Sequence, residues 1–346
     1  MKRYLKIMCR FIIVQCIAVI MIYCFQIYAK ERYENPKLKR EDDYVIEWHD
    51  KNLEKAIREQ TRIETGNIKL SDLWKYKKLD FYNKGIKSIE DLKNLKSLVE
   101  ISLSDNEIED ISPLKDLYLL ESLNLSNNYI ENIEAIENME SLSHLVLHGN
   151  QITDEQLYYI GENIKKLDLS NNNIFNIDAL GKGSKTIKYI NLSGNNISNI
   201  DVLSKLPKTI KTLNLSDNNI TNIEAVGELI DLFSLKLDNN EISDLSPLEN
   251  LTKLYELSLS NNHIFNIEVL GKLTNLGDLI VDHNQISDIT PLENLTKMKW
   301  LSLDDNNIVI LIDFSIMKDL YSLNIGDNPL DEDESERLKL YRQRIK

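Results

Sequence analysis

The chain has 346 residues, of which 52 are leucine, 44 isoleucine and 38 asparagine, whereas ordinary globular domains spread their apolar residues over more types. This composition indicates one short motif copied many times, which forms one elongated body instead of the roughly two globular domains that this length permits. The formal net charge is −14, with 37 basic against 55 acidic side chains in residues 30 to 346. This balance argues against nucleic acid or anionic lipid as the main partner, because both need a clustered basic face. A basic or mixed-charge protein partner stays open, as does acidity that only keeps the molecule soluble.

The first 29 residues predict membrane targeting. Residues 11 to 29 carry no charge, follow four basic residues, and would span about 28 Å as a helix at about 1.5 Å per residue. Either a cleaved signal, with a site at Ile27-Tyr28-Ala29, or a retained anchor fits this pattern. Both expectations place the basic flank in the cytoplasm and export residues 30 to 346, of which 30 to 43 form a charged linker.

The three cysteines also belong to this segment. Cys9, Cys16 and Cys24 all lie in or beside the apolar run, so the exported part contains none. Disulfides and thiol chemistry are therefore excluded for the folded body.

A fixed-period repeat fills residues 76 to 330. The pattern LxxLxLxxNxI occurs eleven times at intervals of 22 or 23 residues, and a weaker twelfth copy, YKKLDFYNKGI, precedes them from Tyr76. The copies start at Leu98, Leu120, Leu142, Ile164, Ile187, Ile210, Leu232, Leu254, Leu276, Met298 and Leu320. This is the pattern of the leucine-rich repeat.

The spacing within each copy predicts its local structure. The alternation in LxxLxL is that of a short strand whose Leu and Ile side chains enter the core. The asparagine falls where the chain leaves the strand, and its amide has the donors and acceptors to satisfy buried backbone groups there, so stacked copies form a ladder. Its members are Asn106, Asn128, Asn150, Asn172, Asn195, Asn218, Asn240, Asn262, Asn284, Asn306 and Asn328.

The second half of each repeat returns apolar residues at a spacing of three, which favours a short 3₁₀ segment. Pro113, Pro247 and Pro291 occupy the same place in their repeats and fix this bend. The stretch from Thr153 to Ile160 is the exception, and we expect a true helical turn there, capped by Thr153. The predicted fold class is an α/β leucine-rich repeat solenoid, a right-handed superhelix with a parallel sheet on its concave face and 3₁₀ or short helical segments on its convex face.

The phrases NEISDLSPLENLTKL and NQISDITPLENLTKM resemble the short repeats of the internalin family of Gram-positive surface proteins. Residues 45 to 92 resemble the amino-terminal cap of that family. We expect the helical cap over residues 44 to 75, with DKNLEKAIREQT as a helix that has Leu53, Ala56 and Ile57 on one face. The resemblance implies an adhesive protein whose concave face binds a host or cell-surface protein. The sequence departs from the family in having neither a downstream immunoglobulin-like domain nor a carboxy-terminal sorting motif.

Residues 331 to 346 place acids first and bases last, which suits the macrodipole of a helix. Leu338, Tyr341 and Ile345 share one face of that helix. We expect it to close the open end of the core, because solenoids need such caps. A basic tail that acts at an anionic surface is the alternative.

The sequence contains no motif for catalysis or for binding a cofactor, so we expect a protein that is not an enzyme and has neither cofactor nor metal. His144 and His148 are four residues apart on one predicted strand, about 13 Å at about 3.3 Å per residue, which is too far for one zinc ion. Asp282 and Asp304 occupy equivalent places on adjacent strands. Stacked like charges cost stability unless a cation intervenes, so calcium is one hypothesis and a solvated acidic surface is the other.

The candidate binding residues are those at the third, fifth and seventh positions that depart from the local habit of Ser, Asn and Asp. They are His144, Val146, His148, Tyr189, Lys236, Asp238, Asp278, Ile280, Asp282, Trp300 and Asp304. An exposed Trp300 beside Ile280, ringed by acids, fits the centre of an interface with a polar rim. The alternative is that Trp300 has no role in binding and only covers its neighbours.

The leading hypothesis is therefore an exported, monomeric protein of a Gram-positive bacterium, tethered to the membrane or released, that binds a protein or surface ligand on its concave sheet. Two alternatives remain open. One is a regulatory or structural scaffold of the cell envelope. The other is an intracellular interaction scaffold similar to phosphatase-regulating repeat proteins.

Overall fold

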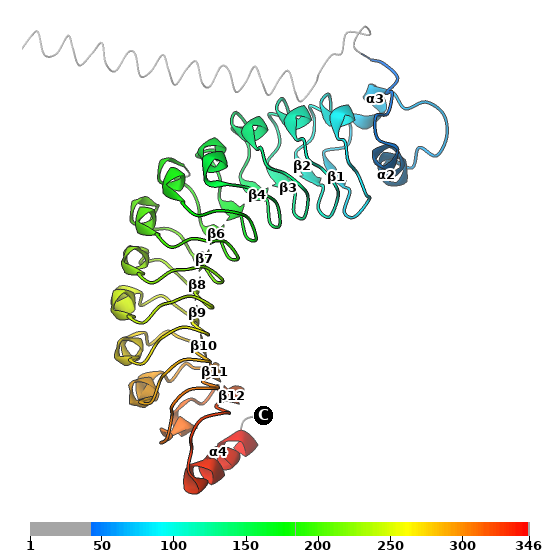
Figure 1. The fold of residues 1–346 in the computed structure, drawn as a ribbon. Coiled ribbons are helices and arrows are strands. Elements are labelled where there is room, and N and C mark those ends of the chain that lie inside the picture. Colours follow the sequence, from blue (N-terminus) through cyan, green and yellow to red (C-terminus); the bar gives the residue numbers. More distant parts are fainter. Residues whose placement is uncertain (1–42, 184, 345–346) are drawn as a thin grey trace, which may run out of the picture.

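The computed structural model describes residues 43 to 183 and 185 to 344, which form one curved solenoid (Figure 1). Phe11 to Ala29 and Ile345 lie outside these residues, as does all of the 30 to 43 linker except Asp43. Within the described part of the chain, no helix is long and apolar enough to cross a membrane.

Twelve parallel strands in chain order form one sheet along the inner side of the arc (Figure 1). Each strand pairs in register with the next at the equivalent repeat position, as Leu123 does with Leu145. The strands are β1 Lys78–Asp80, β2 Glu100–Ser102, β3 Ser122–Asn124, β4 His144–Val146, β5 Lys166–Asp168, β6 Tyr189–Asn191, β7 Thr212–Asn214, β8 Ser234–Lys236, β9 Glu256–Ser258, β10 Asp278–Ile280, β11 Trp300–Ser302 and β12 Ser322–Asn324. The predicted strand in every repeat is confirmed.

Short 3₁₀ helices lie on the outer side of the arc, one between each pair of consecutive strands (Figure 1). They are η2 Glu90–Leu92, η3 Ser112–Leu114, η4 Glu134–Ile136, η5 Asp154–Tyr159, η6 Asp178–Lys182, η7 Asp201–Lys205, η8 Glu224–Glu228, η9 Ser246–Asn250, η10 Glu268–Lys272, η11 Thr290–Asn294 and η12 Phe314–Ile316. As expected, Pro113, Pro247 and Pro291 each lie in the first turn of their segment.

The exception expected at Thr153 is only partly right. Its repeat does have a longer outer segment, η5, but this is a six-residue 3₁₀ helix in which the Thr153 side chain makes no capping hydrogen bond. Asp154 instead accepts the backbone N–H groups of Phe175 and Asn176 in the next repeat. Asp154 therefore joins η5 to the next repeat. This contact favours the 3₁₀ geometry that the other repeats share.

The core is a single continuous stack of aliphatic side chains. The first, fourth and sixth positions of each repeat are buried almost completely, as at Leu254, Leu257 and Leu259. This one-dimensional core accounts for the abundance of Leu and Ile, since each repeat buries its apolar face only against its neighbours.

The asparagine ladder is present at all eleven predicted positions. Asn128 shows the pattern: its side-chain N–H groups donate to the carbonyls of Leu103, Leu125 and Ser126 at 3.0 to 3.1 Å. Its Oδ1 accepts the N–H of Ile108 in the preceding repeat at 3.0 Å. Each asparagine therefore satisfies backbone groups of two repeats, which would otherwise be costly to bury.

The residue before each ladder asparagine adopts the left-handed conformation in all eleven repeats. Its φ is 52° at Asn127, 57° at Asp217 and 53° at His283, while Gly149 and Gly194 fill the same position with φ of 65°. Asparagine, aspartate and glycine are the residues that enter this region at least cost. The turn therefore accounts for a second set of Asn and Asp in the sequence.

The amino-terminal cap consists of helices α2 Lys51–Thr61 and α3 Leu70–Leu73. As predicted, Leu53, Ala56 and Ile57 of α2 are buried. The amide of Gln60 in α2 pairs with both the N–H and the carbonyl of Asp80 in β1. A side chain thus occupies the hydrogen-bonding groups of Asp80 at the first edge of the sheet, which would otherwise remain open to another strand.

Asp50 joins the cap to the first repeat. Its Oδ1 accepts the N–H groups of Asn52 and Leu53 at the start of α2, and its Oδ2 accepts those of Lys87 and Ser88. Burial alone would raise the pKa of Asp50, but these four donors outweigh it and hold the pKa below its ordinary value.

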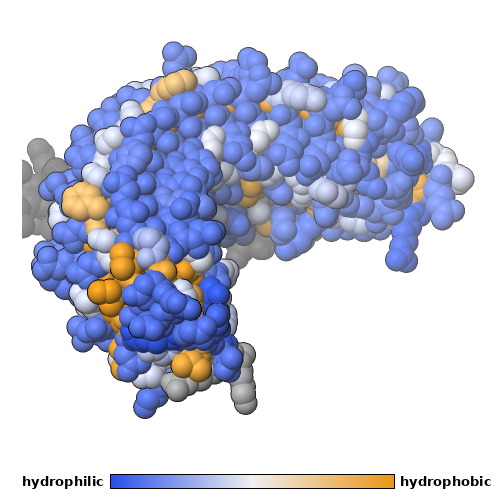
Figure 2. All heavy atoms as spheres, turned by 60° about the horizontal axis from the view of Figure 1, so that its bottom comes forward, coloured by the Kyte–Doolittle hydropathy of each residue, from blue (hydrophilic) through white to orange (hydrophobic). Residues whose placement is uncertain are grey.

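At the other end, helix α4 Glu332–Arg344 packs below β12 (Figure 1). Leu338 is buried, and the Tyr341 ring meets Phe314 edge to face at 5.3 Å between centroids. Leu338 thus joins the buried core, and Tyr341 packs against it. Figure 2 shows hydrophobic side chains gathered at this end of an otherwise mainly hydrophilic surface, and Val309, Ile310 and Leu340 are exposed there.

Candidate functional site

All eleven candidate residues lie on or directly after strands of the concave sheet, and each is half-buried or exposed. They do not form one cluster. His144, Val146 and His148 lie at β4, and Tyr189 lies two strands further on at β6. The other seven, from Lys236 to Asp304, lie at β8, β10 and β11, with none on the intervening β9. This second group is the candidate site.

The two histidines make separate hydrogen bonds to serine. Nδ1 of His144 lies 2.9 Å from Oγ of Ser143, and Nδ1 of His148 lies 2.8 Å from Oγ of Ser170. In the described part of the chain, no three His, Cys, Asp or Glu side chains are grouped so that they could hold a metal ion. His144 is exposed at the start of β4, and His148 is half-buried two residues after its end.

Strands β8 and β9 carry charges that neutralise each other. Lys236 Nζ lies 2.8 Å from Oε1 of Glu256, and Ser234 donates to Oε2 of Glu256 at 2.7 Å. The hydrogen bond to Glu256 raises the pKa of Lys236. Burial alone would raise the pKa of Glu256, but these two donors lower it. Asp238 accepts hydrogen bonds from the hydroxyls of Ser216 and Ser258 and from the backbone N–H of Ser260.

Strand β10 carries an acid that lacks such compensation. Asp278 lies in register between Glu256 and Trp300. Its Oδ1 is buried and has no hydrogen-bond partner among the described residues. Burial, and then the charge of Glu256, raise the pKa of Asp278. The Trp300 side chain beside it is 39% exposed, so an apolar surface adjoins a carboxylate with one oxygen that accepts no hydrogen bond.

Asp282 and Asp304 follow β10 and β11 at the same repeat position, as predicted. Oδ1 of Asp282 accepts the backbone N–H of Asp304 at 2.9 Å, and Asp304 in turn accepts the N–H of Gly326. Burial raises the pKa of Asp282. The stacked carboxylates are thus held by backbone donors from the following repeat, which offset part of their repulsion without a cation.

A row of residues at the second repeat position, where the strands begin, was not predicted from the sequence. Here one carbonyl, that of Phe233, accepts the N–H groups of both Tyr255 and Glu256, so two successive residues face outward. Phe233 and Tyr255 stack with centroids 5.2 Å apart and rings within 3° of parallel. We call this pair the aromatic rim. The signal was visible, because Phe and Tyr replace Lys, Glu or Ser at a position that the prediction did not consider.

The aromatic rim ends at a lysine. Lys299 Nζ lies 5.8 Å from the centroid of the Tyr255 ring. The hydrogen bond with Tyr255 raises the pKa of Lys299. Lys299, the basic residue beside Asp278, is therefore in contact with the phenol of Tyr255.

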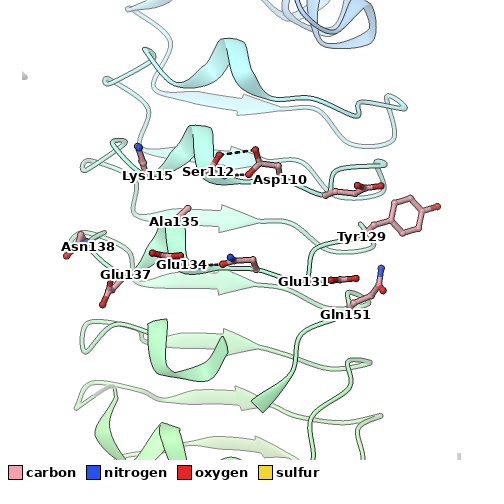
Figure 3. Close-up of a pocket in the computed structure, with 12 residues that line it drawn as sticks. Asp110, Ser112, Lys115, Tyr129, Glu131, Glu134, Ala135, Glu137, Asn138 and Gln151 are labelled. Atoms are coloured by element: carbon pink, nitrogen blue, oxygen red, sulfur yellow. Dashed lines mark hydrogen bonds between the residues drawn. The ribbon is translucent and has the colours of Figure 1, made fainter. Parts of the chain in front are cut away.

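A groove of about 980 Å³ lies elsewhere, on the loops and turns around η3 and η4 (Figure 3). Acidic side chains dominate its lining, including Asp110, Glu131 and Glu134. Asp110 accepts from the N–H and hydroxyl of Ser112 at 2.7 and 2.9 Å. This acid therefore stabilises a turn, and the groove holds none of the candidate residues.

Comparison with known proteins identifies the repeats. A model described as leucine-rich repeats in two copies matches residues 74–116 and 118–159, and a single leucine-rich repeat model matches residues 163–182. A search of curated proteins gives no match.

Among solved structures, an internalin (InlF) from Listeria monocytogenes superposes with a TM-score of 0.70 at 28% identity, covering 82% of this chain and 91% of that one. A leucine-rich repeat protein of Leptospira interrogans shares the fold, with a TM-score of 0.63 at 24% identity over 74% of each chain. The plant peptide hormone receptor RGFR1 in complex with RGF2 gives a TM-score of 0.60 at 25% identity, covering 70% of this chain and 42% of that one.

Proposed function

We propose that this internalin-like leucine-rich repeat protein is a monomeric binding protein that holds a protein ligand on its concave face, over β8 to β11. The observation that carries the proposal is the exposed Trp300 beside Asp278 and Ile280. Aromatic side chains at the centre of a polar patch dominate the energetics of protein interfaces. The repeat fold is a scaffold for protein interaction, and one structurally similar protein, the plant receptor, has been solved with RGF2.

We also propose that residues 11 to 29 direct export, so that the concave face acts outside the cytoplasm of a Gram-positive bacterium. The support is the uncharged run preceded by Lys2, Arg3, Lys6 and Arg10. Amino-terminal sequencing of the expressed chain distinguishes a cleaved signal from an anchor. Protease treatment of intact cells tests exposure, and full protection of the solenoid would contradict export.

The test of binding is capture of proteins on the immobilised full chain, followed by affinity measurement with the captured partner. Trp300→Ala is expected to weaken the complex by more than about 1 kcal/mol, or roughly five-fold, with unchanged thermal unfolding. Phe265→Ala is the matched control, because Phe265 is 63% exposed but lies outside the concave strands. Equal affinity of the Trp300 variant and the wild type would overturn the proposal.

A further inference from the structure

We infer that the ligand is an extended protein segment with ordered charge: an acidic part over β5 and β6, an apolar part over β8 and β9, and a basic part over β10 and β11. This inference rests on the proposed function, because it names the chemistry of the ligand that the concave face would hold. Three zones of the face carry it.

The first zone is basic. Lys165, Lys166 and Lys188 are exposed at β5 and β6, and none of them forms an ion pair within the described residues. Lys166 Nζ lies 5.2 Å from the centroid of the Tyr189 ring. The acid of these strands, Asp168, is engaged by the Ser170 and Asn191 side chains. The three lysines therefore outnumber the one carboxylate of these strands and leave net positive charge there. Lys211 continues the row in the next repeat but is paired with Asp231 at 3.0 Å.

The middle zone is the aromatic rim. The Phe233 side chain is 52% exposed and stacks on Tyr255. Beside the rim, Lys236 is paired with Glu256, and Asp238 is bound by the hydroxyls of Ser216 and Ser258. The rim itself offers apolar contact area, which fits aromatic or aliphatic side chains of a ligand.

The third zone is acidic. Asp278, Asp282 and Asp304 take part in no ion pair within the described residues, and Oδ1 of Asp278 lacks any hydrogen-bond donor. The nearby Lys299 is engaged by Tyr255. A lysine or arginine side chain of a ligand would supply charge and donors to these carboxylates while its stem lies on Trp300.

The distances fit one extended segment. From β5 to β11 there are six strand spacings of about 4.8 Å, roughly 29 Å, which about nine extended residues cover at about 3.3 Å each. Nucleic acid and anionic membrane offer only negative charge, so they would leave the acidic zone unpaired or repelled. A neutral glycan would leave both charged zones unpaired. A protein segment offers both signs together with apolar side chains.

The experiment uses fluorescein-labelled synthetic peptides of about twelve residues and the full chain in mild detergent. The ordered peptide has a Glu block, a central Trp-Leu block and a Lys block. An interleaved peptide has the same composition with mixed charges, and a third peptide replaces the Glu block with Lys. By fluorescence anisotropy, the ordered peptide is expected to bind at least about ten-fold more tightly than either of the others, a difference of about 1.4 kcal/mol.

Lys165→Glu/Lys188→Glu is expected to remove this preference. Lys115→Glu/Lys318→Glu makes the same charge change at two exposed lysines on the outer side and should leave it intact. A photo-reactive group at the acidic end of the ordered peptide should cross-link to β5 and β6, and one at the basic end to β10 and β11.

Equal binding of the ordered and interleaved peptides would overturn the inference, as would no measurable binding of the ordered peptide or cross-links without zone preference. If Trp300→Ala still lowers affinity for the captured partner in that event, the proposed function stands and only the charge order is wrong.

Discussion

Gly277 lies beneath the ring of Tyr255, because a Cβ atom built at position 277 comes within 2.3 Å of the ring carbon Cζ. The same ring is stacked on Phe233 in the preceding repeat. Tyr255 is thus held between an aromatic ring on one strand and a bare backbone on the other. The absence of a side chain at position 277 is what allows the aromatic rim to lie flat on the face.

Gly277→Ala should displace the Tyr255 ring and separate it from Phe233. Because the clashing atoms are the far end of a half-exposed side chain, the ring can turn away, and we expect the free energy of unfolding to change by less than about 1 kcal/mol. NMR of labelled tyrosine, assigned with Tyr255→Phe, measures the loss of the Phe233 ring-current shift. An unchanged Tyr255 signal would show that the ring does not depend on this glycine.

Asn172→Ala should destabilise the solenoid by about 2 to 4 kcal/mol. The substitution leaves the carbonyls of Leu147 and Leu169 and the N–H of Ile152 without their side-chain partner, and these groups are buried. Urea unfolding followed by circular dichroism measures the effect. The neighbouring Asn173 is exposed and serves as the control, since Asn173→Ala is expected to cost less than about 0.5 kcal/mol. Equal effects at the two positions would contradict the ladder's role.

Gly227→Ala should also destabilise, by about 1 to 3 kcal/mol, but for a steric reason. A Cβ at position 227 would lie 2.5 Å from the carbonyl oxygen of Pro247 in the next repeat, and this backbone atom cannot swing aside. Gly161→Ala is the matched control, because nothing lies within 4 Å of the added atom. Differential scanning calorimetry should give a lower melting temperature for the first variant and an unchanged or slightly higher one for the second. The reverse order would be incompatible with this packing.

Asp50 predicts a pH dependence of stability. Its pKa is lower in the folded state than its ordinary value of 3.8, so its contribution is fully present above that value and is lost as pH falls through the folded pKa. Asp50→Asn removes this titration, so the stability gap between wild type and variant should be widest near neutral pH. Urea unfolding of both proteins from pH 7 down to about 2.5 measures the gap. If the difference in unfolding free energy between wild type and variant widened as the pH fell, the assigned direction of the Asp50 pKa shift would be wrong.

The repeat, its strands and its asparagine ladder could be predicted from the sequence because each depends on residues at fixed spacing. Asn106 to Asn328 recur at positions that one local pattern defines, and the resulting register is the same in every pair of strands. The left-handed residue before each ladder asparagine follows the same rule. It was missed because asparagine was assigned only its side-chain role.

The cap contacts and the aromatic rim could not be predicted in this way. Asp50 bonds to Lys87 and Ser88 across 37 and 38 residues of sequence, and no periodicity relates those positions. The aromatic rim was missed because strict alternation of inward and outward side chains along a strand predicts only one outward residue between the first and second core positions of a repeat. The shared carbonyl of Phe233 turns two residues outward, and this hydrogen bond is visible only once the strands are stacked.

The ladder gives the molecule a direction. Asn328 bonds to Leu303 and Ile308 of the repeat before it, and every ladder asparagine reaches backward in the same way. Each repeat therefore supplies hydrogen bonds to the backbone of the repeat before it. Gln60 of the cap supplies hydrogen bonds to the first strand from outside the array. Whole repeats can be added or removed between the two ends without changing the contacts of either cap. The length of the concave face can thus change by one strand, about 4.8 Å, at a time. The same architecture can therefore be matched to ligands of different length.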